Sequence, residues 1–174
     1  NVGASKITDA GDMYAWGETY TKNDFTWDNY KWCKCNGDGQ YEYLTKYVTE
    51  EHYYQHFKDD LATLEASDDV ATAKWGNQWR MPTKEEFEEL MDKCSWDRVN
   101  FDGYVCHKVT GPSGKSIFFV AEWPEWLYKS HYYWTSTLDE DWNQDAYNFC
   151  TYYYDTEMQS YSRERGHLVR PVTE

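Results

Sequence analysis

The fold of this chain is decided by residues 75–94, WGNQWRMPTKEEFEELMDKC. Thr83 precedes a run of good helix formers and Glu86 follows it three positions later, which is the capping-box pattern of a helix N-terminus. The apolar residues of the run return at the spacing of one helical face, at Phe87, Leu90, Met91 and Cys94. The stretch therefore predicts an amphipathic helix that packs on a hydrophobic core.

A second, shorter helix is predicted just before this one. Ser67 is a suitable N-cap, and Asp68 and Asp69 in the following turn would lie at the positive end of the helix dipole. Gly76 follows Trp75, and glycine is the residue that most often ends a helix. The two helices therefore follow one another in the middle of the chain.

Short strands are predicted after about residue 103. Two runs, at 103–109 and 116–121, flank a Gly-Pro-Ser-Gly turn and indicate a hairpin. Further strands are predicted at 131–137, 146–154, about 155–160 and 167–172. Because the helices come first and an antiparallel sheet follows, the sequence predicts an α+β fold.

The composition indicates a single folded domain. The 174 residues include 10 Trp, 17 Tyr and 7 Phe. So many rings supply enough apolar surface for a core, which excludes a disordered acidic chain, and the length predicts one domain spanning 1–174. Residues 12–60 show neither a helical nor a strand period, so we expect long irregular loops held by buried rings.

The formal net charge of −14 bears on partners and location. A strongly acidic protein repels phosphate backbones and anionic lipids, so nucleic acid is not expected as a partner. The sequence holds no apolar run long enough to span a bilayer. Two alternatives follow: the protein is intracellular, or a targeting segment has been removed from the sequence, and the start at Asn1 in place of Met favours the second.

Cysteine and histidine spacing gives little support for zinc or for catalysis. Cys33 and Cys35 precede His52 and His56, but structural zinc sites separate the first two cysteines by two to four residues, and here only one lies between them. A solvated turn rich in aromatic residues is therefore favoured at 52–56. The sequence also lacks a glycine-rich phosphate loop, a nucleophile elbow and an HExxH motif, so we do not expect an enzyme.

One acidic loop is similar to the start of a calcium-binding loop. Oxygen-bearing side chains alternate along it, at Asp139, Asp141, Asn143 and Asp145. Two features of an EF-hand are missing, because Gln144 stands where glycine is needed and Cys150 stands where glutamate is needed. A solvated acidic turn is favoured, calcium stays open as the alternative, and no other cofactor is expected.

The tail from 142 to 167 has the composition of a binding surface. Tyr, Ser, Asn, Asp and Arg are crowded there, and tyrosine supplies rigid contact area at a low entropic cost. In a strand, Asn148, Cys150 and Tyr152 would share a face exposed to water. The predicted ligand-binding residues are Asn148, Cys150, Tyr152, Tyr153, Tyr154, Asp155, Glu157, Gln159, Tyr161, Arg163, Arg165 and His167. The alternative is a second core layer whose tyrosine hydroxyls reach solvent.

Six short motifs give the chain a resemblance to a known family. They are YAWGET at 14–19, YKWC at 30–33, WGNQWRMPTKEE at 75–86, CSW at 94–96, YWTST at 133–137 and VRPV at 169–172. Over about residues 12–172 the chain closely resembles the FISUMP-type paralogous-domain family of secreted gut-bacterial proteins. The resemblance implies a C-type-lectin-like fold akin to that of the formylglycine-generating enzyme, with two helices and an antiparallel sheet joined by long irregular loops. It does not carry over that enzyme's activity, because only Cys150 stands where the enzyme has a late cysteine pair.

The resemblance also implies a function. A subset of the family is similar to the variable proteins of diversity-generating retroelements, in which a segment matching about 138–168 is rewritten by mutagenic reverse transcription. We therefore expect a secreted or cell-surface binding module, as an adhesin tip or part of a larger surface protein or pilus. Its diversified, tyrosine-rich face would take a protein or glycan ligand. A fixed carbohydrate-binding lectin domain with calcium at the acidic loop is the alternative.

The same resemblance implies details of the scaffold. Cysteines matching Cys33 and Cys94 recur in the family, which implies a Cys33–Cys94 disulfide in an exported protein. Trp75, Trp79 and Trp134 are expected to be buried. Adenine changes in an Asn codon reach the residues at Cys150, Tyr152, Asp155, Ser160, Tyr161 and Ser162. They do not reach those at Trp142, Glu157, Met158, Gln159 and Glu164, which would require other template codons.

Overall fold

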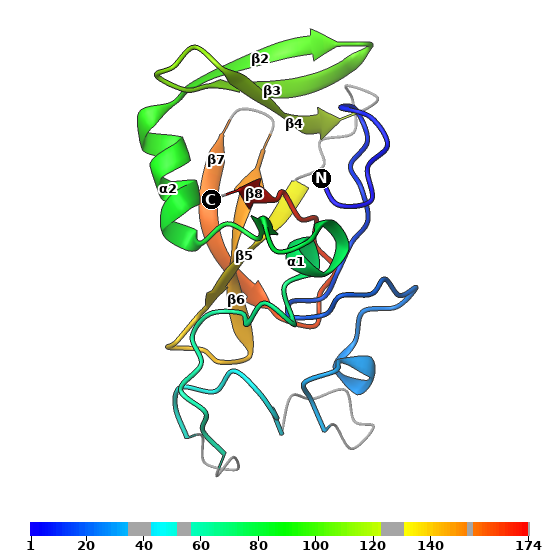
Figure 1. Ribbon diagram of the computed structural model, residues 1–174, viewed down its shortest axis with the longest axis vertical. Coiled ribbons are helices and arrows are strands. Elements are labelled where there is room, and N and C mark those ends of the chain that lie inside the picture. The colour runs from blue at the N-terminus through cyan, green and yellow to red at the C-terminus, as the bar shows by residue number, and fades with distance from the viewer. Residues whose placement is uncertain (35–42, 52–56, 123–130, 153–154, 174) are drawn as a thin grey trace.

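The computed structural model in Figure 1 describes residues 1–34, 43–51, 57–122, 131–152 and 155–173. The helical segments in this part of the chain are η1 (Trp27–Asn29), α1 (Val70–Trp75) and α2 (Lys84–Lys93). The strands are β1 (Trp79–Arg80), β2 (Ser95–Phe101), β3 (Tyr104–Thr110), β4 (Ser116–Glu122), β5 (His131–Leu138), β6 (Asp145–Thr151), β7 (Thr156–Ser162) and β8 (Val172–Thr173). None of these helices has the length and apolarity needed to cross a bilayer. The predicted α+β class is confirmed.

The strands form three small antiparallel sheets. Their strand orders are β2-β3-β4, β5-β6-β7 and β1-β8. Figure 1 shows the β2-β3-β4 sheet above the β5-β6-β7 sheet, with α2 running down one side between them. The helix therefore covers one face of the β5-β6-β7 sheet and leaves the other face to other segments.

Helix α2 begins where the capping box predicts. The Glu86 amide donates to the Thr83 hydroxyl at 3.3 Å, and the Thr83 amide donates to the Glu86 carboxylate at 2.9 Å. Arg80 donates both guanidinium ends to the same carboxylate, each at 2.7 Å. Phe87 is buried and stacks on Phe149 of β6 with ring centroids 4.7 Å apart. The predicted packing of this helix on a core is confirmed.

Helix α1 begins two residues later than predicted. Its N-cap is Asp69, and one carboxylate oxygen accepts from the amides of Ala71 at 2.8 Å and Thr72 at 3.1 Å. The other oxygen accepts from the Met81 amide at 2.7 Å, so this carboxylate also ties α1 to the strand that follows. The predicted N-cap at Ser67 is therefore wrong, whereas the predicted end at Gly76 is confirmed.

The strand predictions are confirmed for five segments and wrong at two places. Strands β3 to β7 match the runs from 103 to 160. Strand β2 was not expected, because most of its side chains are exposed and it shows no apolar alternation. The predicted strand at 167–172 is mostly irregular, with single bridges from His167 to Tyr14 and from Leu168 to Tyr133.

Buried rings hold the irregular first third of the chain, as predicted. Tyr14, Trp16 and Tyr47 are fully buried, and together with Trp134 they belong to the largest core cluster. The rings of Trp16 and Tyr47 meet edge to face at 5.0 Å. Three tryptophans were expected to be buried. Trp134 is buried and Trp79 is half-buried, but the prediction is wrong for Trp75, which is 42% exposed.

Candidate ligand-binding face

The two faces of the β5-β6-β7 sheet have different surroundings. Phe149 and Tyr147 of β6 point toward α2, where Phe149 stacks on Phe87 and the Lys84 ammonium lies 3.8 Å from the Tyr147 ring centroid. The intervening β6 residues lie on the opposite face with their registered partners on β5 and β7. We name this opposite face the tyrosine face; it carries Tyr132, Trp134, Asn148, Cys150, Glu157, Gln159 and Tyr161.

A stack of rings covers one half of the tyrosine face. The His167 imidazole stacks on Trp134 at 4.1 Å and on Tyr132 at 5.1 Å, and Tyr161 lies 5.6 Å from it. Burial, with a smaller effect from the Arg165 charge, lowers the pKa of His167 to about 3. His167 is therefore a neutral ring at physiological pH. Tyr161 is the outermost ring and is 44% exposed.

Three polar side chains cover the other half. The Tyr152 hydroxyl donates to the Glu157 carboxylate at 2.7 Å, and the Gln159 amide donates to the Tyr152 hydroxyl at 2.7 Å and also to that carboxylate. The hydrogen bond to Glu157, together with burial, raises the pKa of Tyr152. The tyrosine is therefore protonated and acts as a donor. Five predicted residues, Tyr152, Glu157, Gln159, Tyr161 and His167, thus lie together on this side of the sheet.

Asn148 lies beneath this surface, between Trp134 and Gln159 in the sheet register. It is fully buried, and its amide oxygen and nitrogen have no hydrogen-bond partner in the described part of the protein. Leaving a buried amide unpaired costs free energy, so such a group marks either strain or a missing partner. The prediction placed Asn148 on the correct face but wrongly expected it to be exposed.

Cys150, His167 and Arg163 are also buried, contrary to the expected exposure. The Arg163 guanidinium donates to the carbonyls of Lys46, Tyr47 and Asn143 at 2.9, 3.0 and 2.8 Å. It also donates to the Tyr30 hydroxyl at 3.0 Å. Arg163 therefore holds the irregular loops together, and its expected place on a binding surface is wrong. Asp155 and Arg165 are exposed.

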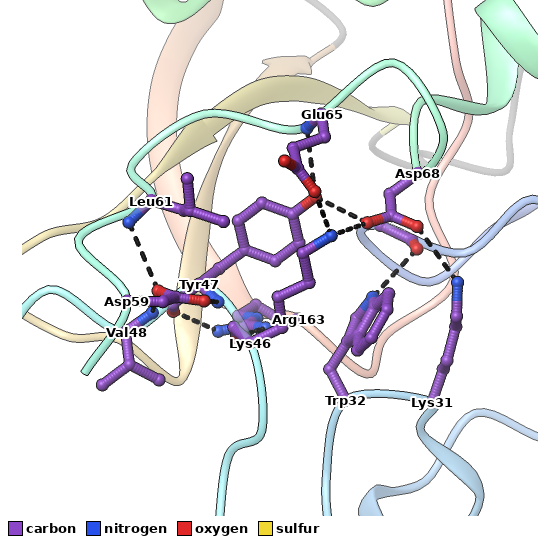
Figure 2. Close-up of polar contacts among 11 residues, drawn as sticks. Lys31, Trp32, Lys46, Tyr47, Val48, Asp59, Leu61, Glu65, Asp68 and Arg163 are labelled. Carbon is purple, nitrogen blue, oxygen red and sulfur yellow. Dashed lines mark hydrogen bonds and ion pairs between the residues drawn. The ribbon is translucent and has the colours of Figure 1, made fainter. Parts of the chain in front are cut away.

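An ion-pair network next to Arg163 was not foreseen from the sequence. Figure 2 shows Asp68 between Lys31 and Lys46, which donate to its two oxygens at 3.1 and 2.6 Å. The Tyr47 hydroxyl also donates to Asp68 at 2.7 Å and accepts from the Glu65 amide at 3.0 Å. Asp68 falls in the first turn of the helix predicted from the sequence, where an acidic side chain is explained without an ion-pair partner.

Hydrogen bonds within the network keep Lys46 and Asp68 charged. Burial alone would lower the pKa of Lys46, but hydrogen bonds to Asp68 and Glu65 outweigh it and raise that pKa. Burial would raise the pKa of Asp68, but hydrogen bonds from Lys46, Tyr47 and Lys31 outweigh it and lower that pKa. Both groups are therefore charged at neutral pH, and neither is a ready general base or nucleophile.

The backbone beside this network is strained and well anchored. Tyr47 has a φ of 60°, which is costly for a large side chain. The Asp59 carboxylate accepts from the amides of Tyr47 and Val48, each at 2.8 Å, as Figure 2 shows. These bonds fix the turn that presents the Lys46 and Tyr47 carbonyls to Arg163.

The acidic loop at 139–145 uses its oxygens within the protein. The Asn143 carboxamide oxygen accepts from the amides of Thr49 at 2.7 Å and Glu50 at 3.1 Å. An Asp139 oxygen accepts from the Asp141 amide at 3.1 Å. Within the described ranges, no group of three or more His, Cys, Asp or Glu residues is placed to hold a metal ion. Calcium binding by Asp139, Asp141, Asn143 and Asp145 stays the untested alternative.

The expected Cys33–Cys94 disulfide is wrong. Cys33 is disulfide-bonded, whereas Cys94 carries a free thiol. The disulfide also removes Cys33 as a zinc ligand, because a ligand must be a thiolate. The other residues of the zinc alternative, Cys35, His52 and His56, lie outside the described residues, as do Tyr153 and Tyr154 of the predicted binding set.

Comparison of the chain with protein-family models, with curated proteins and with solved structures gives no match. The geometry of the tyrosine face is therefore what the structure offers on function.

Proposed function

We propose that this chain is a secreted or cell-surface ligand-binding module of C-type-lectin-like fold, which takes a protein or glycan ligand on its tyrosine face. The observation that carries the proposal is the arrangement of Tyr152, Glu157 and Gln159. These side chains bond to one another at an outer strand, beside exposed Tyr161. A group of polar and aromatic side chains that is satisfied internally and open to solvent is suited to contact a partner.

The chemistry of the face fits an amphipathic ligand. Tyr161 and the rings behind it offer flat apolar area, while Glu157 and Gln159 offer acceptor and donor atoms at the same surface. Asp155 and Arg165 are exposed in the flanking segments and would add charge of both signs. The supporting ring stack of Trp134 and His167 is buried, so the surface is supported by a fixed scaffold.

Asn148 offers a further donor and acceptor beneath this surface. Its amide has no partner among the described residues, and Gln159 of the next strand lies directly beside it in the register. A ligand that displaces the Gln159 side chain would gain access to this amide. This arrangement favours a ligand that carries hydroxyl or amide groups, as glycans and peptides both do.

Diversification by a retroelement is part of the proposal. Of the positions that adenine changes in an Asn codon reach, Tyr161 and Asp155 are exposed and Tyr152 is half-buried at the same surface. Cys150 is buried, so variation there would act on the core. We propose that the exposed positions are the diversified ones, while Arg163 belongs to the constant frame.

Two exposed tyrosines provide a matched test of the binding face. Tyr161→Ala removes a ring that is 44% exposed, and Tyr20→Ala removes one that is 46% exposed elsewhere. The wild-type protein is first screened on an array of purified glycans and purified surface proteins to find a ligand. We expect Tyr161→Ala to lower the affinity for that ligand by about tenfold or more. Tyr20→Ala should leave capture unchanged. Equal effects of the two variants, or a large fall in melting temperature for Tyr161→Ala alone, would contradict the proposal.

Comparison of the coding locus among sibling isolates tests diversification separately. We expect a nearby near-copy of the segment encoding 138–168 and substitutions confined to its adenines. Substitutions scattered over all bases would remove the retroelement from the proposal and leave a fixed binding module of the same fold.

A further inference from the structure

A hollow of about 450 Å³ lies on the α2 side of the β5-β6-β7 sheet, whereas the tyrosine face is on the other side of that sheet. Its apolar lining comes from Phe87 and Leu90 of α2 and from Ile117 and Phe119 of β4, and β8 closes one side. Figure 1 shows α2, β4 and β8 grouped around this region. Small-molecule sites in proteins typically have volumes of about 300–1,000 Å³ and mostly apolar walls, so the hollow has the size and lining of such a site.

Two charged residues line this hollow, and Glu86 is the one with a counter-ion among the residues that the structure describes. The Glu86 carboxylate is held by the two ends of the Arg80 guanidinium, each at 2.7 Å. Arg170 donates to the Phe118 carbonyl at 3.3 Å and lies 5.6 Å from the Phe119 ring centroid. None of the described carboxylates forms an ion pair with Arg170. Burial lowers the pKa of Arg170, which shows that its charge is partly desolvated.

Among the described residues, Arg170 has no acid and one hydrogen-bond acceptor, which is unexpected for a half-buried cation in a protein with 31 acidic and 17 basic residues. The other half-buried or buried cations described above are used: Lys46 pairs with Asp68, Arg80 with Glu86, and Arg163 with four oxygens. A partly desolvated guanidinium has the strongest gain from a carboxylate that completes its fork geometry. Arg170 also borders a second hollow of about 400 Å³, which Lys6 lines as well.

We propose that the hollow between α2, β4 and β8 binds a small organic carboxylate with an apolar body. The carboxylate pairs with the Arg170 guanidinium, and the body contacts Phe87, Leu90 and Phe119. This site is separate from the tyrosine face and does not depend on the function proposed for it.

The test uses a matched pair of probes, 2-naphthoate and 2-naphthalenemethanol, which share the apolar body and differ in charge. By titration calorimetry we expect wild-type protein to bind naphthoate about tenfold more tightly than the alcohol. Arg170→Gln should lower the affinity for naphthoate by about tenfold and change the affinity for the alcohol by no more than about twofold. Arg165→Gln makes the same charge change at an exposed position and should leave both affinities unchanged.

Two further variants keep the proposal testable if Arg170→Gln does not fold. Leu90→Trp fills the hollow without changing charge and should abolish binding of both probes, whereas Tyr161→Ala on the other face should change neither. Arg170→Lys retains the cation and should retain part of the preference for naphthoate. The proposal is overturned if wild-type protein binds neither probe, if Arg170→Gln binds naphthoate as wild type does, or if Tyr161→Ala abolishes binding.

Discussion

Arg163 and Arg165 stand two positions apart in the same tail and have opposite surroundings. Arg163 is fully buried and donates to three backbone carbonyls and a hydroxyl, whereas the Arg165 side chain is 58% exposed. Their sequence context gives no basis for separating them, because the partners of Arg163 come from Tyr30, Lys46 and Tyr47, more than a hundred positions away. Long-range contacts of this kind decide which residues of a tail are scaffold.

This contrast gives a prediction for stability. Arg163→Ala leaves two buried carbonyls and one part-buried carbonyl without their donor, so we expect it to lower the free energy of unfolding by about 3–5 kcal/mol. Arg165→Ala should change it by no more than about 0.5 kcal/mol. Urea denaturation followed by tryptophan fluorescence measures both. A loss below about 1 kcal/mol for Arg163→Ala would mean that the loops do not depend on this residue.

At the scale of elements, local signals located α2 correctly and failed at β2. The capping box needs only residues within one turn, so Thr83 and Glu86 predicted the start of α2 without any knowledge of the fold. Strand β2 is an outer strand with mostly exposed polar side chains, and its backbone pairing with β3 leaves no apolar pattern to detect. The tail at 167–172 is largely buried but pairs through single bridges at His167 and Leu168, and an apolar run does not distinguish such a segment from a strand.

Strand alternation also predicted part of the site. It correctly separated Asn148 and Cys150 from Phe149 and Thr151, since alternate residues must lie on opposite faces. It did not show which parts of each face are covered. His167, which bridges to Tyr14, stacks on Trp134 and Tyr132, and these contacts cannot be deduced from the strand itself.

The capping box of α2 gives a prediction at this scale. Thr83→Ala removes the acceptor of the Glu86 amide, and we expect the free energy of unfolding to fall by about 1 kcal/mol. Thr83→Ser keeps the hydroxyl and should retain most of that stability. Chemical denaturation of the two variants side by side makes the comparison. Equal stabilities would show that the cap hydroxyl contributes nothing and that Arg80 and Glu86 alone hold the helix start.

For the whole molecule, the excess of acid explains where cations are placed. Lys31 and Lys46 share buried Asp68, and Lys22 pairs with buried Glu18, so these two interior acids are neutralised by specific bases. The composition predicted the acidic surface and the ring-filled core, but not this pairing, because it joins residues from separate irregular loops. Arg170 differs from these lysines, because among the described residues it has no carboxylate partner and donates to one carbonyl, that of Phe118, at the edge of the hollow between α2, β4 and β8.

Stability of the whole molecule toward acid should depend on His167. Its pKa is lowered from 6.5 to about 3 by burial, so in the unfolded chain it takes up a proton at a higher pH than in the folded protein. Its contribution to stability is fully present above pH 6.5 and is lost progressively as the pH falls toward 3. Each pKa unit corresponds to about 1.4 kcal/mol.

His167→Gln removes this titration while His107 and the acidic groups stay in place. Between about pH 7 and pH 4.5 we therefore expect the free energy of unfolding to fall by about 2 kcal/mol less in the variant than in the wild-type protein. Urea denaturation at both pH values measures this difference. Protonation of the acidic groups changes the charge repulsion in both proteins alike, so that effect cancels when the two proteins are compared. An NMR titration supplies the direct control, because the His167 ring should stay neutral throughout this range. A ring that titrates near 6.5, or pH profiles that run parallel, would show that His167 is solvated and that the ring stack on the tyrosine face is open to water.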